Sequence, residues 1–363
     1  MEAGACASAP GPERVDVEVH MRAVYVLRSG HVFDALKTQV PADARSSVTV
    51  WIHSSTLGIE DKCFHGMSRV SRILAHDPEA HDVGASPPVA APALRMLIAK
   101  LRAYEPALVD LIHVLVGDET EVHRVGDCAF ALCSNLREVV LPRSVARVGL
   151  CAFEGCGALT SVTLPDALVC IGEAAFGGCK SLPSVVLPHS LTRVAKSTFA
   201  QCISLTSVTL PNSLTRIGEG AFEQCASLTS VALPRSLAHI ERGAFRFTSL
   251  TSVTLPSSLT RLGGCAFEEC WALTSVTLPN SLTFLEDSVF CGCSALAAVT
   301  LPNSITRIGK KTFQGCTSLT AVTLPNTVNY TGREAFSGCT RLAQVTMPSV
   351  RPHVGVNAFY GCP

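Results

Sequence analysis

From about Leu111 to the last residue, the apolar positions return in one fixed order. The repeating unit is L-x-x-V-x-L-P-x-x-L-x-x-I-G-x-x-A-F-x-x-C, where x is mostly polar. Apolar residues two apart, such as Val208 and Leu210, predict a short β-strand with one buried face, which Pro211 ends because proline cannot donate a ladder hydrogen bond. Stacked strands then form one long parallel sheet. A turn that favours glycine is predicted after the isoleucine, at Gly218, Gly263 and Gly309.

The most regular position in the unit is a phenylalanine. It recurs every 23 residues from Phe130 to Phe359, except for one 22-residue step between Phe245 and Phe267. A cysteine follows three residues after nearly every phenylalanine, and the short step carries Thr248 there instead. A fixed period of this size is typical of a solenoid, in which each unit buries its apolar face against its neighbours. The pattern therefore predicts a repeat solenoid of about eleven 23-residue repeats.

The N-terminal third is irregular, and four regions are predicted along the chain. Residues 1–14 are expected to be disordered, and residues 15–70 to be β-rich, with strands around 15–27 and 47–52 and a degenerate repeat that ends near Met67. Residues 71–110 are interpreted as a linker or insertion followed by a capping helix over 93–104. The solenoid itself is predicted over residues 111–363.

Charge and hydropathy exclude several classes of protein. Lysine plus arginine equals aspartate plus glutamate at 29 each, so no overall charge attracts nucleic acid. No stretch approaches the roughly 20 apolar residues that span a bilayer, and the first twenty residues lack the apolar region of a secretory signal. Ten of the seventeen cysteines occupy one repeat position and are predicted to be buried, reduced thiols. Together these features favour a cytoplasmic protein, with the cell surface as the alternative.

The L-x-x-V-x-L strand and the F-x-x-C ending together resemble the BspA-like subfamily of leucine-rich repeats over residues 111–363. The resemblance implies an arc-shaped solenoid with a parallel β-sheet on its concave face, here preceded by an irregular α/β region. It also implies an adhesion or protein-interaction scaffold without a shared enzymatic activity, in a family that is often surface-exposed. It brings no fixed binding residues.

Candidate partner-binding residues lie at outward positions of the repeat. The threonine row alternates with the buried strand residues, and its candidates are Thr209, Thr254, Thr277, Thr300 and Thr323. The arginine row lies between the buried leucine and isoleucine of the L-T-R-I segment, and its candidates are Arg193, Arg216, Arg261, Phe284, Arg307 and Tyr330. Arginine and aromatic residues are favoured at interfaces. The alternative for both rows is a solvated face that keeps the solenoid soluble.

No motif predicts chemistry. Cys128, Cys151 and Cys265 precede the phenylalanine by two residues, where variable residue types indicate exposure, but their spacing is not that of a zinc site. No Ser/His/Asp or Cys/His constellation emerges, and no catalytic residue, cofactor or metal site is predicted.

The leading hypothesis is a non-enzymatic interaction scaffold that binds a protein partner through its extended surface. The alternative is a BspA-like surface adhesin exported without a recognisable signal peptide. A third hypothesis places an enzymatic or adaptor module in residues 15–110. The C-terminal end lacks a polar cap, so either that end self-associates with another subunit or the sequence is incomplete.

Overall fold

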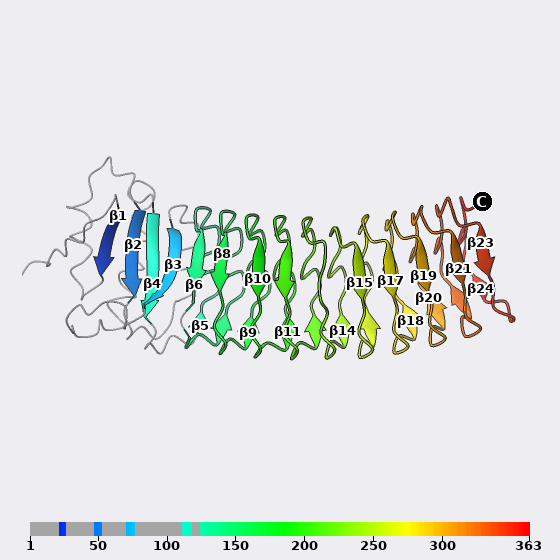
Figure 1. The fold of residues 1–363 in the computed structure, drawn as a ribbon, viewed down its shortest axis with the longest axis horizontal. Coiled ribbons are helices and arrows are strands. Elements are labelled where there is room, and N and C mark those ends of the chain that lie inside the picture. The colour runs from blue at the N-terminus through cyan, green and yellow to red at the C-terminus, as the bar shows by residue number, and fades with distance from the viewer. Residues whose placement is uncertain (1–21, 27–46, 53–69, 77–110, 118–123, 142) are drawn as a thin grey trace, which may run out of the picture.

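The computed structural model describes residues 22–26, 47–52, 70–76, 111–117, 124–141 and 143–363. Every regular element in these ranges is a β-strand, and successive turns follow one another along the long axis of the molecule (Figure 1). The predictions of disorder over 1–14, of a degenerate repeat ending near Met67 and of a capping helix over 93–104 fall outside these ranges.

Each turn contributes a three-residue strand to a first row of parallel strands. The middle residue of each strand points into the core and its neighbours point outward, as the alternating pattern predicts. Equivalent residues pair across turns, as Ser252 does with Ser275. The first row consists of β6 (Glu138–Val140), β8 (Ser161–Thr163), β10 (Ser184–Val186), β12 (Ser207–Thr209), β15 (Ser252–Thr254), β17 (Ser275–Thr277), β19 (Ala298–Thr300), β21 (Ala321–Thr323) and β23 (Gln344–Thr346).

A second row of two-residue strands, which the sequence pattern does not predict, runs beside the first. In Figure 1 the arrows of the two rows point in opposite directions. Most neighbouring strands pair in register, for example Arg216 with His239 and His239 with Arg261. The strands at Cys170 and Arg193 do not pair, and neither do those at Arg261 and Phe284. The second row consists of β5 (Arg124–Val125), β7 (Arg147–Val148), β9 (Cys170–Ile171), β11 (Arg193–Val194), β13 (Arg216–Ile217), β14 (His239–Ile240), β16 (Arg261–Leu262), β18 (Phe284–Leu285), β20 (Arg307–Ile308), β22 (Tyr330–Thr331) and β24 (His353–Val354).

Four N-terminal strands extend the first row. They are β1 (Arg22–Val26), β2 (Ser47–Ile52), β3 (Val70–His76) and β4 (Leu111–Gly117), and the sheet order is β1-β2-β4-β3-β6-β8. β3, not β4, pairs with the first regular turn, so the segment at Leu111 is not the unit next to the array. β3 also extends a strand into the range predicted as a linker.

The phenylalanines form one stacked column through the core. The eleven rings from Phe130 to Phe359 stack pairwise with centroids 5.2–5.7 Å apart and planes within 13° of parallel. Carbon atoms in contact lie only about 3.5–4.0 Å apart, so parallel rings at these centroid distances are offset sideways. The ten rings from Phe130 to Phe336 are fully buried, which confirms the column as the centre of the core.

The cysteine column has a polar role in addition to filling space. From Cys156 onward, each thiol of the column donates a hydrogen bond to the carbonyl oxygen of the phenylalanine one turn earlier, as Cys202 does to Phe176 at 3.2 Å and Cys225 to Phe199 at 3.2 Å. The same carbonyl also accepts a backbone N–H within its own turn, as Phe199 does from Cys202. All cysteines in the described ranges are free thiols. The position thus suits a small residue that is apolar in bulk and carries one donor.

The first row is interrupted at two places. β8 and β10 do not pair, and the residue directly before β10 is Pro183. In the next turn the equivalent residue, Thr206, donates its N–H to the carbonyl oxygen of Pro183. Proline has no N–H, so the equivalent bond from Pro183 is missing. Between β12 and β15 the segment 230–232 is not a strand, and the short step of the repeat follows directly. The second row continues unbroken there through β13, β14 and β16, so the one-residue deficit is absorbed by the first row.

The glycine after the isoleucine is needed for a different reason from the predicted one. The backbone of Gly218 is not in the left-handed region. A Cβ atom on Gly218 would lie 2.7 Å from the carbonyl carbon of Ala195 in the previous turn. The position therefore favours glycine because neighbouring backbones approach closely.

Candidate functional site

The predicted residues of the threonine row are all exposed on the first row of strands. The hydroxyl of Thr209 has no hydrogen-bond partner among the described residues, and the same holds for the hydroxyls of its equivalents Thr254, Thr277, Thr300 and Thr323. In contrast, Thr206 and Thr274, which precede their strands, each donate the hydroxyl to a carbonyl one turn earlier at 3.0 Å. The threonine row thus offers hydroxyl groups to solvent, and its binding role stays a prediction.

The arginine row lies on the second row of strands, and part of it is neutralised by carboxylates. Arg216 Nη2 lies 2.9 Å from Glu241 Oε1, and Arg261 Nη1 lies 3.8 Å from Glu241 Oε2. Arg261 Nε also lies 3.3 Å from Glu286 Oε1. These contacts form one network of alternating charge across four turns. Arg193 has no ion-pair partner among the described residues.

Sequence reasoning missed Glu241 and Glu286, the two glutamates of this ion-pair network. Glu241 and Glu286 follow the buried strand residue at the position where most turns carry glycine. The repeat pattern predicts only a turn at that position, and it does not predict that an acidic residue there pairs with the arginine row. A signal was nonetheless present, because a charged residue replaces glycine only in these two turns between Gly218 and Gly332.

The C-terminal part of the arginine row is stacked instead of ion-paired. We name Phe284, Arg307, Tyr330 and His353 the stacked ladder; they occupy equivalent positions in β18, β20, β22 and β24. Arg307 Cζ lies 4.5 Å from the centroid of the Tyr330 ring. The Tyr330 and His353 rings stack with centroids 5.3 Å apart. Phe284 is 42% exposed, so the ladder presents an aromatic surface to solvent.

The structure does not bring the candidate residues together into one site. The threonine row and the arginine row lie on different sheets, each as a line that crosses successive turns (Figure 1). Within the arginine row, Phe284, Arg307 and Tyr330 are adjacent, whereas Arg216 and Arg261 belong to the ion-paired part. The chain therefore offers two separate linear surfaces.

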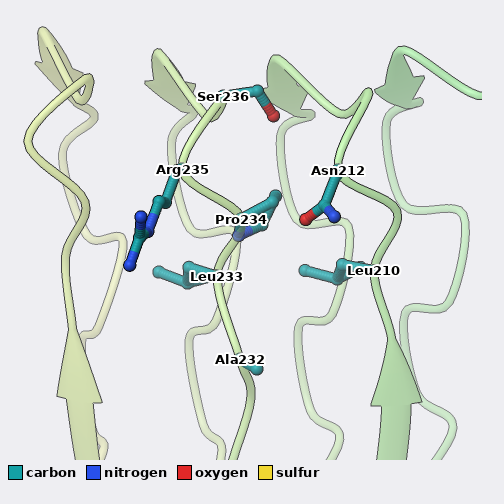
Figure 2. Close-up of a pocket in the computed structure, with 7 residues that line it drawn as sticks. All are labelled: Leu210, Asn212, Ala232, Leu233, Pro234, Arg235 and Ser236. Atoms are coloured by element: carbon teal, nitrogen blue, oxygen red, sulfur yellow. The ribbon is translucent and has the colours of Figure 1, made fainter.

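An open hollow of about 460 Å³ lies where the first row is interrupted (Figure 2). Apolar side chains of Leu210 and Leu233 line it together with the polar Asn212 and Arg235. The hydroxyl of Ser236, also in its lining, already donates to Leu214 O at 2.6 Å. No group in the lining is a general base or nucleophile in an activated setting, so the hollow gives no basis for catalysis.

An ion pair and a cation–π contact lie at the short step of the repeat. Arg246 Nε lies 2.8 Å from Glu268 Oε2, and Arg246 Cζ lies 4.6 Å from the Phe247 ring centroid. Thr248 takes the place of the column cysteine and donates to Phe245 O at 2.8 Å. The substitution therefore keeps a donor at this buried position.

The cysteines that precede the phenylalanine by two residues are half-buried. Burial, followed by the neighbouring Glu154, raises the pKa of Cys151 to about 12. Burial and Glu268 raise the pKa of Cys265 to about 11. The thiolate is the reactive form of cysteine, so these thiols remain protonated and unreactive near neutral pH.

The described ranges lack both a metal-binding cluster and a membrane-spanning helix. They contain no group of three or more His, Cys, Asp or Glu side chains that could hold a metal ion. They also contain no helix long and apolar enough to cross a membrane.

The chain is similar to several solved leucine-rich repeat proteins. A leucine-rich repeat protein from Bacteroides ovatus is 27% identical, with 80% of this chain and 84% of that chain covered and a TM-score of 0.48. A leucine-rich repeat protein of T. pallidum is 34% identical over 48% of this chain and 78% of that chain, with a TM-score of 0.40. A leucine-rich cell surface protein from Faecalibacterium prausnitzii is 28% identical over 66% and 79%, with a TM-score of 0.40.

No curated protein matches the chain. Residues 123–249 and 238–363 match the family described as BspA type leucine-rich repeat region, in six copies. The matched residues are those that build the two rows of strands and the phenylalanine column. The chain therefore belongs to the BspA-type leucine-rich repeat family.

Proposed function

We propose that this chain is a non-enzymatic interaction module that binds a protein partner through the arginine row, at the stacked ladder. BspA-type repeat proteins are typically protein-interaction or surface proteins. The observation that carries the proposal is the exposure of Phe284 in a row whose other members are mostly polar. Arginine beside rigid aromatic rings is the composition that concentrates binding energy at protein interfaces.

A comparison of two double variants tests this proposal. Phe284→Ala/Tyr330→Ala removes the rings of the ladder, and Thr277→Ala/Thr300→Ala removes two hydroxyls of the threonine row. Each variant is compared with the wild-type chain by quantitative recovery of bound proteins. We expect the ladder variant to lose partners that the threonine variant keeps. Loss of bound proteins by the threonine variant alone would assign binding to the threonine row. Equal recovery by all three chains would exclude both surfaces as the binding site.

We further propose a cytoplasmic location, supported by the free thiols throughout the described ranges. A membrane-impermeant amine-reactive label applied to intact cells tests this, because lysines such as Lys196 and Lys310 are exposed at the surface of the fold. Labelling only after lysis is expected. Labelling of intact cells would instead support the surface adhesin.

Self-association through the last turn is also proposed. Val356 and Tyr360 there are 71% and 72% exposed, and contiguous apolar surface favours association. Light scattering at rising protein concentration is expected to show an increasing mass, and Val356→Asp is expected to reduce it. A constant monomer mass for the wild-type chain would contradict this.

A further inference from the structure

Charge is distributed unevenly along the solenoid. Residues 124–287 contain twelve basic and twelve acidic residues, whereas residues 288–363 contain six basic residues and the single acidic residue Glu334. The balanced total of the whole chain hides this difference. The turns that carry most of the stacked ladder therefore have a net charge of +5, which attracts acidic groups.

Arg307, like Arg193, has no carboxylate partner among the described residues, unlike Arg216 and Arg261 of the same row. Glu286, the nearest equivalent for Arg307, is turned away, since it accepts the N–H of Gly264 at 2.7 Å and contacts Arg261. On the other side the equivalent position is Gly332, which has no side chain.

The Arg307 guanidinium is held in place by stacking. It lies 4.5 Å from the Tyr330 ring centroid, and Phe284 is its register partner on the preceding strand. A guanidinium that stacks through its face keeps its N–H edge available for two parallel hydrogen bonds to one carboxylate. Stacking also reduces the entropy lost when a ligand binds, because the side chain is already ordered.

We infer that the stacked ladder binds an acidic segment of a protein partner, with a carboxylate of that segment on Arg307. This inference rests on the proposed function and adds the chemical class of the partner. The aromatic rings contact the apolar parts of the segment, and the surplus of basic residues in these turns neutralises its remaining carboxylates.

Fluorescence anisotropy with a labelled octaglutamate peptide tests the inference, and an octaglutamine peptide serves as the neutral control. We expect the full chain to bind octaglutamate and not octaglutamine, with an affinity that falls as NaCl rises from 50 to 500 mM. Arg307→Ala is expected to weaken binding about tenfold, which is the loss of about 1.4 kcal/mol. Arg307→Lys keeps the charge but not the two parallel hydrogen bonds. Its affinity for octaglutamate is expected to lie between those of the wild-type chain and Arg307→Ala.

Arg216→Ala is the matched control, because it removes an arginine from the same row whose charge is already paired. It should change the affinity less than twofold. Equal effects of Arg216→Ala and Arg307→Ala, or no octaglutamate binding at millimolar concentration, would overturn the inference. Tighter binding of a single-stranded oligonucleotide at the same residues would also overturn it. Loss of a protein partner by Phe284→Ala/Tyr330→Ala without octaglutamate binding would leave the proposed function standing and reject only the acidic class.

Discussion

At the scale of single residues, the core is defined by columns in which one side chain repeats from turn to turn. Phe222 shows this directly, since its ring is fully buried and stacks on Phe199 at 5.6 Å and on Phe245 at 5.4 Å. Removal of one ring takes contacts from two neighbouring turns as well as its own. The cost of a substitution is therefore shared across three turns.

Phe222→Ala is expected to lower the free energy of unfolding by about 3–5 kcal/mol, through lost burial and the cavity that remains. Urea denaturation followed by circular dichroism measures the change. Phe284→Ala is the control, because its ring is partly in solvent and its removal should change stability by less than about 0.5 kcal/mol. Equal midpoints for Phe222→Ala and the wild type would mean that the column is not core.

Thr331 is a buried residue whose hydroxyl has no hydrogen-bond partner, in a column that otherwise holds Val, Ile and Leu. Thr331→Val removes this unsatisfied group with little change in shape and should raise stability by about 1–2 kcal/mol. Thr312 is equally buried, but its hydroxyl donates to Gly309 O at 2.9 Å. Thr312→Val should therefore lower stability by about 1 kcal/mol. A decrease for both variants would contradict this interpretation.

The sequence predicted these columns well and their polar details poorly. Burial follows from the repeat, so Phe222 and its equivalents are correctly assigned to the core. The thiol donors were missed because cysteine at a buried position was interpreted only as a small apolar residue. Phe284 and Tyr330 were found because they interrupt a row of arginines, whereas the stacking of Tyr330 on Arg307 depends on side-chain directions that no spacing reveals.

At the scale of elements, the three-residue strands could be predicted and the two-residue strands could not. Val208 between two outward residues gives a period of two, but a pair such as Arg216–Ile217 is too short to show any period. The interruption at Pro183 has a visible sequence cause. The interruption at 230–232 is adjacent to the 22-residue step between Phe245 and Phe267, so the missing residue lies in the following turn and acts through the stacking of that turn.

Pro183→Thr is expected to join β8 and β10. Thr206 at the equivalent position donates both its N–H and its hydroxyl to the previous turn. Two such bonds contribute about 1–3 kcal/mol, and the loss of proline costs about 0.4–1 kcal/mol by freeing the unfolded chain. The net gain should be about 1 kcal/mol in urea denaturation, with slower amide exchange at Ser184. Unchanged exchange at Ser184 would show that proline is not what separates the strands.

At the scale of the whole molecule, stability is a property of the stack and responds to conditions that act on every turn at once. Burial raises the pKa of Cys156, Cys202 and Cys339 from an ordinary value of 9.0 to about 12. The unfolded chain therefore releases these protons at lower pH than the folded chain. The contribution is fully present below pH 9 and is lost as the pH rises toward 12.

Urea denaturation at pH 7.5, 9, 10 and 11 is expected to show constant stability up to about pH 9 and a steep decline above it. Cys156→Ala/Cys202→Ala removes two of the titrating thiols and should make that decline shallower. Tyrosine and lysine titrate in the same range in both proteins, so the difference between the two curves isolates the thiols. Identical declines would assign the alkaline unfolding to other groups.

The contacts between turns join residues at nearly constant separations in the sequence. The thiol of Cys202 and its acceptor Phe176 are 26 positions apart, and Thr206 and Pro183 are 23 positions apart. Insertion or deletion of one complete 23-residue turn preserves all of these separations, whereas a single-residue change must be absorbed locally, as it is near 230–232. The length of the array can therefore change by duplication or loss of whole turns without redesign of the core. Each such event between Arg216 and Phe284 moves the stacked ladder relative to the ion-paired part of the arginine row by one strand spacing, about 4.8 Å. The distance between these two parts of the surface is therefore adjustable only in fixed steps.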